Sequence, residues 1–65
     1  MDKKLIEGEI KETNLVHDAK MVESVINGHH LIQIEKYGKQ LSMVNVANYA
    51  SWSGAFEAAM NNAGM

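Results

Sequence analysis

The sequence predicts an α+β fold in which a three-stranded antiparallel sheet is covered by a C-terminal helix. Three observations carry this prediction: alternating apolar residues near the N-terminus, a self-complementary hairpin pattern in residues 29–46, and helically spaced aromatic residues near the C-terminus. A chain of 65 residues can support one small core, so we expect residues 1–65 to fold as a single domain.

The hairpin in residues 29–46 is the clearest element. Its centre is Tyr37-Gly38, where Gly38 can adopt the positive φ that a two-residue hairpin turn requires. The turn predicts the cross-strand pairs Lys36/Lys39, Glu35/Gln40, Ile34/Leu41, Gln33/Ser42, Ile32/Met43 and Leu31/Val44. The inward face would then consist of Ile32, Ile34, Leu41 and Met43. A slip of one residue would pair Lys36 with Leu41 and mix the two faces, so the pattern predicts its own register.

The first half of the chain predicts one strand and one ambiguous element. Residues 5–12 alternate between apolar and charged positions, as in a half-buried strand that Gly8 weakens. As a helix, residues 14–26 would form an apolar stripe that ends at an Asn27-Gly28 cap. As a strand, the segment would pair its residues 22–26 with residues 30–34 through a three-residue loop. Three β-branched residues among its last five favour the strand. The helix gives the order βαββα, which we expect; the strand gives the alternative, a βββα meander plus helix.

The C-terminal segment predicts a helix. Its apolar stripe has spacings of three and four residues and consists of Tyr49, Trp52, Phe56 and Met60. Asn48 or Ser51 can cap its start, and Gly64 can end it. Such an aromatic group is more typical of a core than of a binding surface. If Phe56 and Met60 pack on the sheet, Trp52 near the helix start would be half exposed, and the sequence leaves open whether it belongs to the core or to the surface.

Composition narrows the classes of function. The net charge is −2, and all six basic residues are lysine. Because arginine supplies the bidentate contacts to guanine and phosphate, its absence makes a nucleic-acid-binding role less favoured. The chain has no cysteine, which excludes disulfides and thiolate metal sites. No apolar run approaches the roughly 18 residues of a membrane span, so we expect a cytoplasmic protein that does not enter a membrane.

The sequence predicts no catalytic, cofactor-binding or metal site. His29 and His30 are neighbours, and side chains of neighbouring strand residues point to opposite faces, so both cannot bind one ion. His17 lies far away in the sequence and has no ligand spacing with either of them. The glycines are scattered singly, and no serine lies in a nucleophile motif. We therefore expect that the protein is not an enzyme.

These exclusions favour a small non-catalytic protein-interaction module that binds and modulates a protein partner. A compact regulator or a virus-encoded inhibitor would fit this description by size. The expected partner-binding residues are Trp52, Tyr49, Leu31, Val44 and Tyr37. Leu31 and Val44 are expected on the sheet face opposite the core, where a second copy could dock and form a homodimer. The alternative is a nucleic-acid-binding module that uses the hairpin tip, Lys36-Tyr37-Gly38-Lys39.

Overall fold

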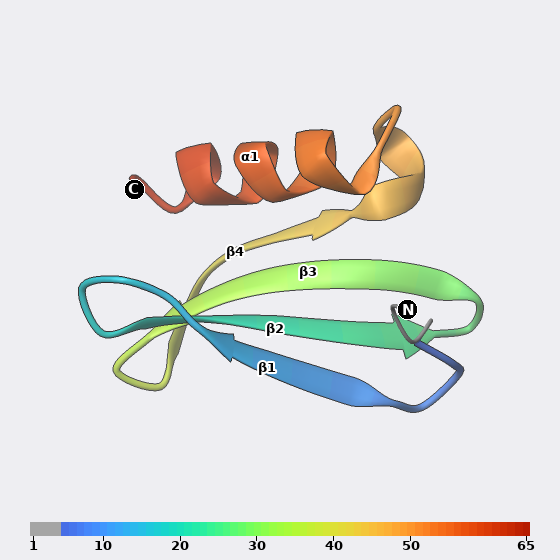
Figure 1. The fold of residues 1–65 in the computed structure, drawn as a ribbon, viewed down its shortest axis with the longest axis horizontal. Coiled ribbons are helices and arrows are strands. Elements are labelled where there is room, and N and C mark those ends of the chain that lie inside the picture. Colours follow the sequence, from blue (N-terminus) through green and yellow to red (C-terminus); the bar gives the residue numbers. More distant parts are fainter. Residues whose placement is uncertain (1–4) are drawn as a thin grey trace.

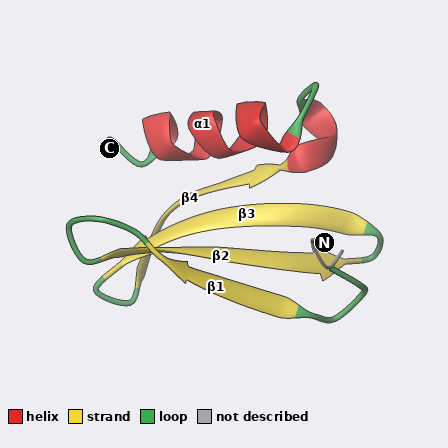
Figure 2. Cartoon of the chain, in the orientation of Figure 1, coloured by secondary structure: helices red, strands yellow, loops and turns green. Residues whose placement is uncertain are grey.

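The computed structural model describes residues 5–65 and shows a four-stranded antiparallel sheet with one helix packed on it (Figure 1). The elements in chain order are β1 (Ile10–Asn14), β2 (Ala19–Ile26), β3 (His29–Lys36), β4 (Lys39–Asn45), the 3₁₀ helix η1 (Val46–Asn48) and α1 (Trp52–Asn62). Each strand pairs with the next one in the chain, so the sheet is a simple meander, and the helix follows it (Figure 2). The predicted α+β class and the C-terminal helix are confirmed.

The prediction of three strands is wrong, because most of residues 14–26 form the strand β2 and not a helix. Asn27 and Gly28 both have positive φ, 53° and 79°. This pair of left-handed residues forms a two-residue hairpin turn whose twist matches that of the flanking strands. Ile26 therefore pairs with His29, and Met21 pairs with Ile34. The Asn-Gly pair that resembles a helix cap is thus a hairpin turn, and the three-residue loop of the strand alternative is one residue too long.

The first strand begins later than the alternation predicts. Residues 5–9 precede β1 and are tied to the β2–β3 turn by Glu7, whose carboxylate accepts hydrogen bonds from the backbone N–H groups of Asn27 (2.6 Å) and Gly28 (2.8 Å). Gly8 has a φ of 84°, and its N–H donates to the carbonyl of Val25 at 2.9 Å. The glycine thus belongs to a turn that leads into β1.

The β3–β4 hairpin has the predicted turn but a different register. Lys36 pairs with Lys39 and Glu35 with Gln40, as expected, but Ile34 then pairs with Ser42 because Leu41 forms a β-bulge. Every later pair shifts by one residue, so that Gln33 pairs with Met43, Ile32 with Val44 and Leu31 with Asn45. The bulge exchanges the two faces of β4. Ser42 and Val44 point towards the helix and are buried, whereas Leu41 and Met43 are 36% and 49% exposed.

The core lies between α1 and the strands β3 and β4. Its buried members are Met21, Ile32, Ile34, Val44, Ala55 and Ala59. The helix meets the sheet through Ala55 and Ala59, which are both fully buried, and the larger side chains of Phe56 and Met60 pack at the margin. The hydroxyl of Ser42 donates to the carbonyl oxygen of Ala59 at 2.7 Å, in a buried position. Small side chains on both elements thus let the helix approach the sheet closely.

Both helix ends follow the sequence signals. The side chain of Ser51 accepts a hydrogen bond from the N–H of Gly54, as an N-cap. At the other end, Gly64 has a φ of 80° and donates to Asn61, and the N–H of Met65 donates to the carbonyl of Met60 at 3.0 Å. These two bonds form a Schellman motif, so the predictions of Ser51 as a cap and of Gly64 as the end are confirmed.

Because of the bulge, truncating two neighbouring side chains of β4 should lower the free energy of unfolding by different amounts. Val44→Ala removes buried methyl groups and is expected to lower the free energy of unfolding by about 2 kcal/mol. Met43→Ala removes a half-exposed side chain and should cost less than about 1 kcal/mol. Urea denaturation of both variants measures the difference. A larger loss for Met43→Ala than for Val44→Ala would mean that the hairpin adopts the regular register without the bulge.

Candidate functional site

The sheet face opposite α1, which we call the open face, is not covered by any element within residues 5–65. Side chains alternate between the two faces of a strand, and the helix contacts β3 and β4 from the other side. The residues on the open face are Ile10, Glu12 and Asn14 of β1; Lys20, Val22, Ser24 and Ile26 of β2; His29, Leu31, Gln33 and Glu35 of β3; and Gln40, Met43 and Asn45 of β4.

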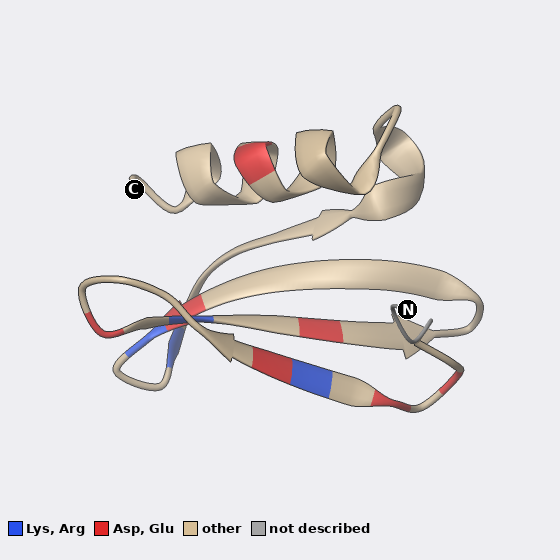
Figure 3. Ribbon diagram, viewed as in Figure 1, with Lys and Arg blue, Asp and Glu red and all other residues tan. Residues whose placement is uncertain are grey.

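The open face has an apolar end and a charged end. Near the β2–β3 turn, Ile10 and Ile26 are 68% and 51% exposed. Near the β3–β4 turn, Lys20 lies opposite Glu35 in the register and forms an ion pair with Glu12 at 3.2 Å. Figure 3 shows charged residues gathered at that end of the sheet. Charges also occur at the apolar end, where Glu9 lines the depression beside Ile10, and Glu12 lies two residues further along β1. Large exposed aliphatic side chains gathered on one face are typical of a surface that another chain covers.

A shallow depression lies at the apolar end of the open face. It has a volume of about 250 Å³ and surrounds Ser24, with Ile10, Val22 and Ile26 among its walls. Ser24 is the smallest residue of the face, and the longer side chains around it leave it only 9% exposed. The depression is therefore a hollow of the size that one aliphatic side chain can enter.

Both edges of the sheet are poorly suited to accept another strand. The edge strand β1 has five residues, and Lys11 and Glu12 place charges on both of its faces. At the other edge, β4 is interrupted by the bulge at Leu41 and packs against α1. Short length, charge and bulges are features that prevent edge-to-edge pairing. These features favour the open face over an edge as the contact surface.

On the helix side, Trp52 is anchored to the sheet. Its indole Nε1–H donates to Oε1 of Glu23 at 2.7 Å, and its ring stacks on Phe56 with the centroids 5.2 Å apart. Nε2 of His30 lies 3.0 Å from the same oxygen of Glu23, a contact that becomes an ion pair when the imidazole is protonated. Trp52 is 40% exposed, so the indole has one fixed side and one accessible side. Glu23 was not among the residues predicted from the sequence. It lies two residues after Met21, so in a strand both side chains point to the same face of the sheet, and this spacing was the available signal.

The remaining predicted contact residues lie apart from one another. Val44 is 7% exposed beneath the helix, so its expected place on the open face is wrong; the bulge is the reason. Leu31 does lie on the open face. Tyr49 precedes α1 and is 38% exposed. Tyr37 is 79% exposed at the hairpin tip, where its hydroxyl donates to Asp18 at 3.0 Å. The structure therefore does not unite these five residues into one site.

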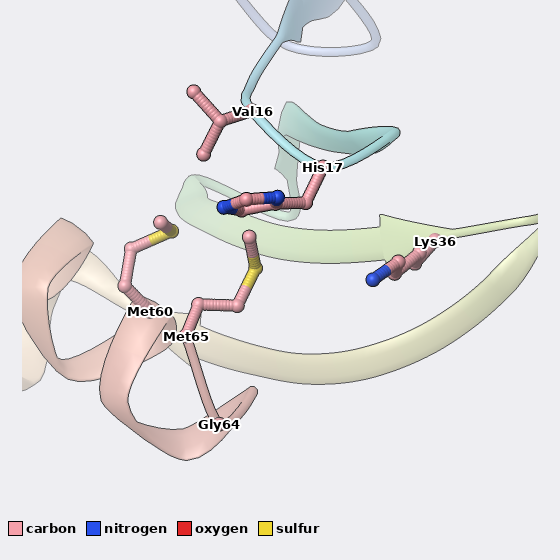
Figure 4. A pocket seen from close by; sticks show the side chains of 6 residues that line it. All are labelled: Val16, His17, Lys36, Met60, Gly64 and Met65. Carbon is pink, nitrogen blue, oxygen red and sulfur yellow. The ribbon is translucent and has the colours of Figure 1, made fainter.

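A second cleft lies at the C-terminal end of α1 (Figure 4). It has a volume of about 410 Å³ and is lined by Val16, His17, Lys36, Met60, Gly64 and Met65. His17 points towards the two methionines, and Lys36 stands at the margin (Figure 4). Within residues 5–65, no group of three or more His, Cys, Asp or Glu side chains is arranged to hold a metal ion. The cleft thus offers mainly apolar contacts.

No protein-family model matches the chain, and neither a curated protein nor a solved structure shows significant similarity to it. Among the described residues, no helix combines the length and the apolar character that crossing a bilayer requires. Function must therefore be argued from the surfaces themselves.

The anchoring of Trp52 predicts a measurable role for Glu23. Glu23→Ala removes the acceptor of the indole N–H and should lower the free energy of unfolding by about 1–3 kcal/mol. Because the chain has one tryptophan, its fluorescence reports the site directly, and we expect its emission to move to longer wavelength. Glu12→Ala is the control, since it removes a carboxylate from an exposed ion pair and should cost less than about 1 kcal/mol. Equal stability losses and unchanged emission in both variants would contradict the anchoring role.

Proposed function

We propose that this chain is a small, non-catalytic protein-interaction module of the cytoplasm, which binds and modulates a protein partner as a regulator or inhibitor. The observation that supports the proposal most strongly is the open face. Ile10, Ile26 and Met43 are each about half exposed or more on this one uncovered surface. Isolated exposed aliphatic residues are ordinary on protein surfaces, but a contiguous group on an uncovered sheet is a feature of contact surfaces.

The size of the domain supports the same proposal. Within residues 5–65, one helix covers one face of the four-stranded sheet, and no second helix or strand covers the other face. The open face carries five apolar residues among polar and charged ones, and these apolar side chains are removed from water only when another layer covers them. A partner protein would supply the missing layer and add the stability that a small core lacks.

The nucleic-acid alternative has less support at the hairpin tip. The hydroxyl of Tyr37 is held by the carboxylate of Asp18, and Nζ of Lys36 lies 5.7 Å from the centre of the tyrosine ring. A carboxylate at the tip repels phosphate, and the nearby lysine occupies one approach to the ring on which a base would stack. We therefore place the functional contact on the open face.

A matched pair of substitutions tests the proposal. Ile10 and Val16 are β-branched aliphatic residues with similar exposure, 68% and 65%, but only Ile10 lies on the open face. Ile10→Lys should weaken the binding of a captured partner protein by about tenfold or more, because it places a charge in an apolar contact. Val16→Lys should leave the binding unchanged.

Affinity capture from the source cell identifies the partner, and titration of the purified partner gives the dissociation constants. Circular dichroism and the unfolding midpoint establish that both variants are folded. If Ile10→Lys and Val16→Lys bind every captured partner as tightly as the wild type does, the open face is not the functional contact.

A further inference from the structure

The register of the sheet determines how two open faces can meet. Consider a twofold axis that runs parallel to the strands, midway between β2 and β3. It places β2 of one protomer over β3 of its partner, and β1 over β4. We call a set of directly paired residues across the four strands a row. This rotation keeps positions along the strands and reverses the order of the strands. Each row therefore lies over the same row of the other copy, with its β1 end over the β4 end. An axis across the strands would instead set the apolar end of one face against the charged end of the other.

The first consequence concerns the depression around Ser24. Ser24 and Leu31 are direct neighbours in one row, on β2 and β3 respectively. The twofold axis therefore carries Leu31 of the second copy over Ser24, where the hollow of about 250 Å³ lies. The same operation carries Leu31 of the first copy over Ser24 of the second. Leu31 is half-buried, so its exposed part makes this contact. A contact in which each copy supplies both partner residues is the isologous type found in twofold dimers.

The second consequence concerns the charged end. Lys20 and Glu35 are neighbours in another row, again on β2 and β3. The axis that matches Leu31 with Ser24 therefore also carries Glu35 of the second copy over Lys20, and the reciprocal pair forms as well. Opposite charges meet at both positions. The same operation carries Ile10 over Asn45 and Met43 over Glu12 of the other copy. The complementary contacts of this arrangement are therefore the Leu31–Ser24 contact and the Lys20–Glu35 pair.

The area is that of a weak, reversible contact. Strands lie about 4.8 Å apart and rise about 3.3 Å per residue, so strands of 5, 8, 8 and 7 residues present roughly 440 Å² per protomer and about 900 Å² for two. That total is below the size of stable protein–protein interfaces and within the range of transient ones. An interface of this size, with a depression that receives an aliphatic side chain, fits a reversible dimer of modest affinity.

We propose that the occupant of the open face is a second copy of this chain, docked face to face about a twofold axis parallel to the strands. In this dimer, Leu31 of each copy inserts at Ser24 of the other, and Lys20 of each copy pairs with Glu35 of the other. This inference rests on the proposed function of the open face and names the partner.

Charge reversal in two separate proteins tests the proposal. In Lys20→Glu, both intermolecular pairs become repulsions between carboxylates; in Glu35→Lys, both become repulsions between ammonium groups. Sedimentation equilibrium at low salt should therefore show a dimer for the wild type and a dissociation constant raised about tenfold for each variant alone. An equimolar mixture of the two variants restores both attractive pairs, so it should return to the wild-type dissociation constant.

The mixture separates this contact from effects inside one protomer, because Lys20 and Glu35 also face each other within the chain. Lys39→Glu and Glu57→Lys are the controls, since they make the same charge changes at exposed positions away from the open face. Each control should form the wild-type dimer, alone and mixed. If Lys20→Glu does not fold, Leu31→Ala provides the second test, with an expected dissociation constant about tenfold above that of the wild type.

A wild-type chain that stays monomeric at millimolar concentration would overturn the inference, as would a mixture no more associated than its components. Either result leaves the proposed function standing if Ile10→Lys still abolishes the capture of another protein. The proposed function itself fails if Ile10→Lys binds every captured partner protein as tightly as the wild type does.

Discussion

The contact between β4 and α1 determines how this small chain distributes its apolar residues. The hydroxyl of Ser42 reaches the carbonyl of Ala59 at 2.7 Å, and no large side chain fits between strand and helix at this point. Leu41 lies between Gln40 and Ser42, which pair with consecutive residues of β3. Leu41 therefore has no partner on β3 and forms a bulge. Because side chains alternate along a strand, this single extra residue decides that Val44 is buried and that Met43 faces outward.

The two faces of the sheet differ as a consequence. Close packing through Ala55 and Ala59 buries Ile32 and Ile34 completely, and Trp52 extends the cover towards β2 by its hydrogen bond to Glu23. The opposite face keeps aliphatic residues that no other element covers. A short chain with one helix cannot shield both faces of a four-stranded sheet. We propose that association with another chain removes the second face from water.

Local signals predicted the β3–β4 turn and the helix caps, whereas the Asn27-Gly28 turn was interpreted as a helix cap and longer-range contacts determined the rest. Gly38 and Ser51 act as predicted because turn and cap chemistry depend on the residue and its immediate neighbours. The strand β2 was assigned to a helix because both of its faces carry apolar residues: Met21 faces the helix and Val22 faces outward. This removes the alternation by which a half-buried strand is recognised. The bulge was not predicted because the sequence of β4 fits either face towards the helix: Leu41 and Met43, or Ser42 and Val44. In the structure the second pair faces the helix, where Ser42 bonds to the carbonyl of Ala59.

The candidate surface was foreseen in part. Leu31 was expected on the face opposite the helix and lies there, but Val44 was placed with it from the regular register. Trp52 is half exposed as expected, yet it lies on the helix side and is fixed by Glu23. Ile10 and Ile26 join Leu31 only because the strands β1, β2 and β3 align them on one surface. A sequence pattern cannot supply that alignment, since it depends on two hairpin registers at once.

The central claim is that the open face binds a second copy through the rows that contain Leu31 and Lys20. The most direct measurement is an isotope-filtered nuclear Overhauser spectrum of an equimolar mixture of labelled and unlabelled protein, which detects only contacts between different chains. The account predicts contacts from the Leu31 methyl groups to Ser24 and Val22 of the other chain. Contacts that arise instead from Trp52 and Phe56, or a spectrum without contacts between chains at millimolar concentration, would contradict it.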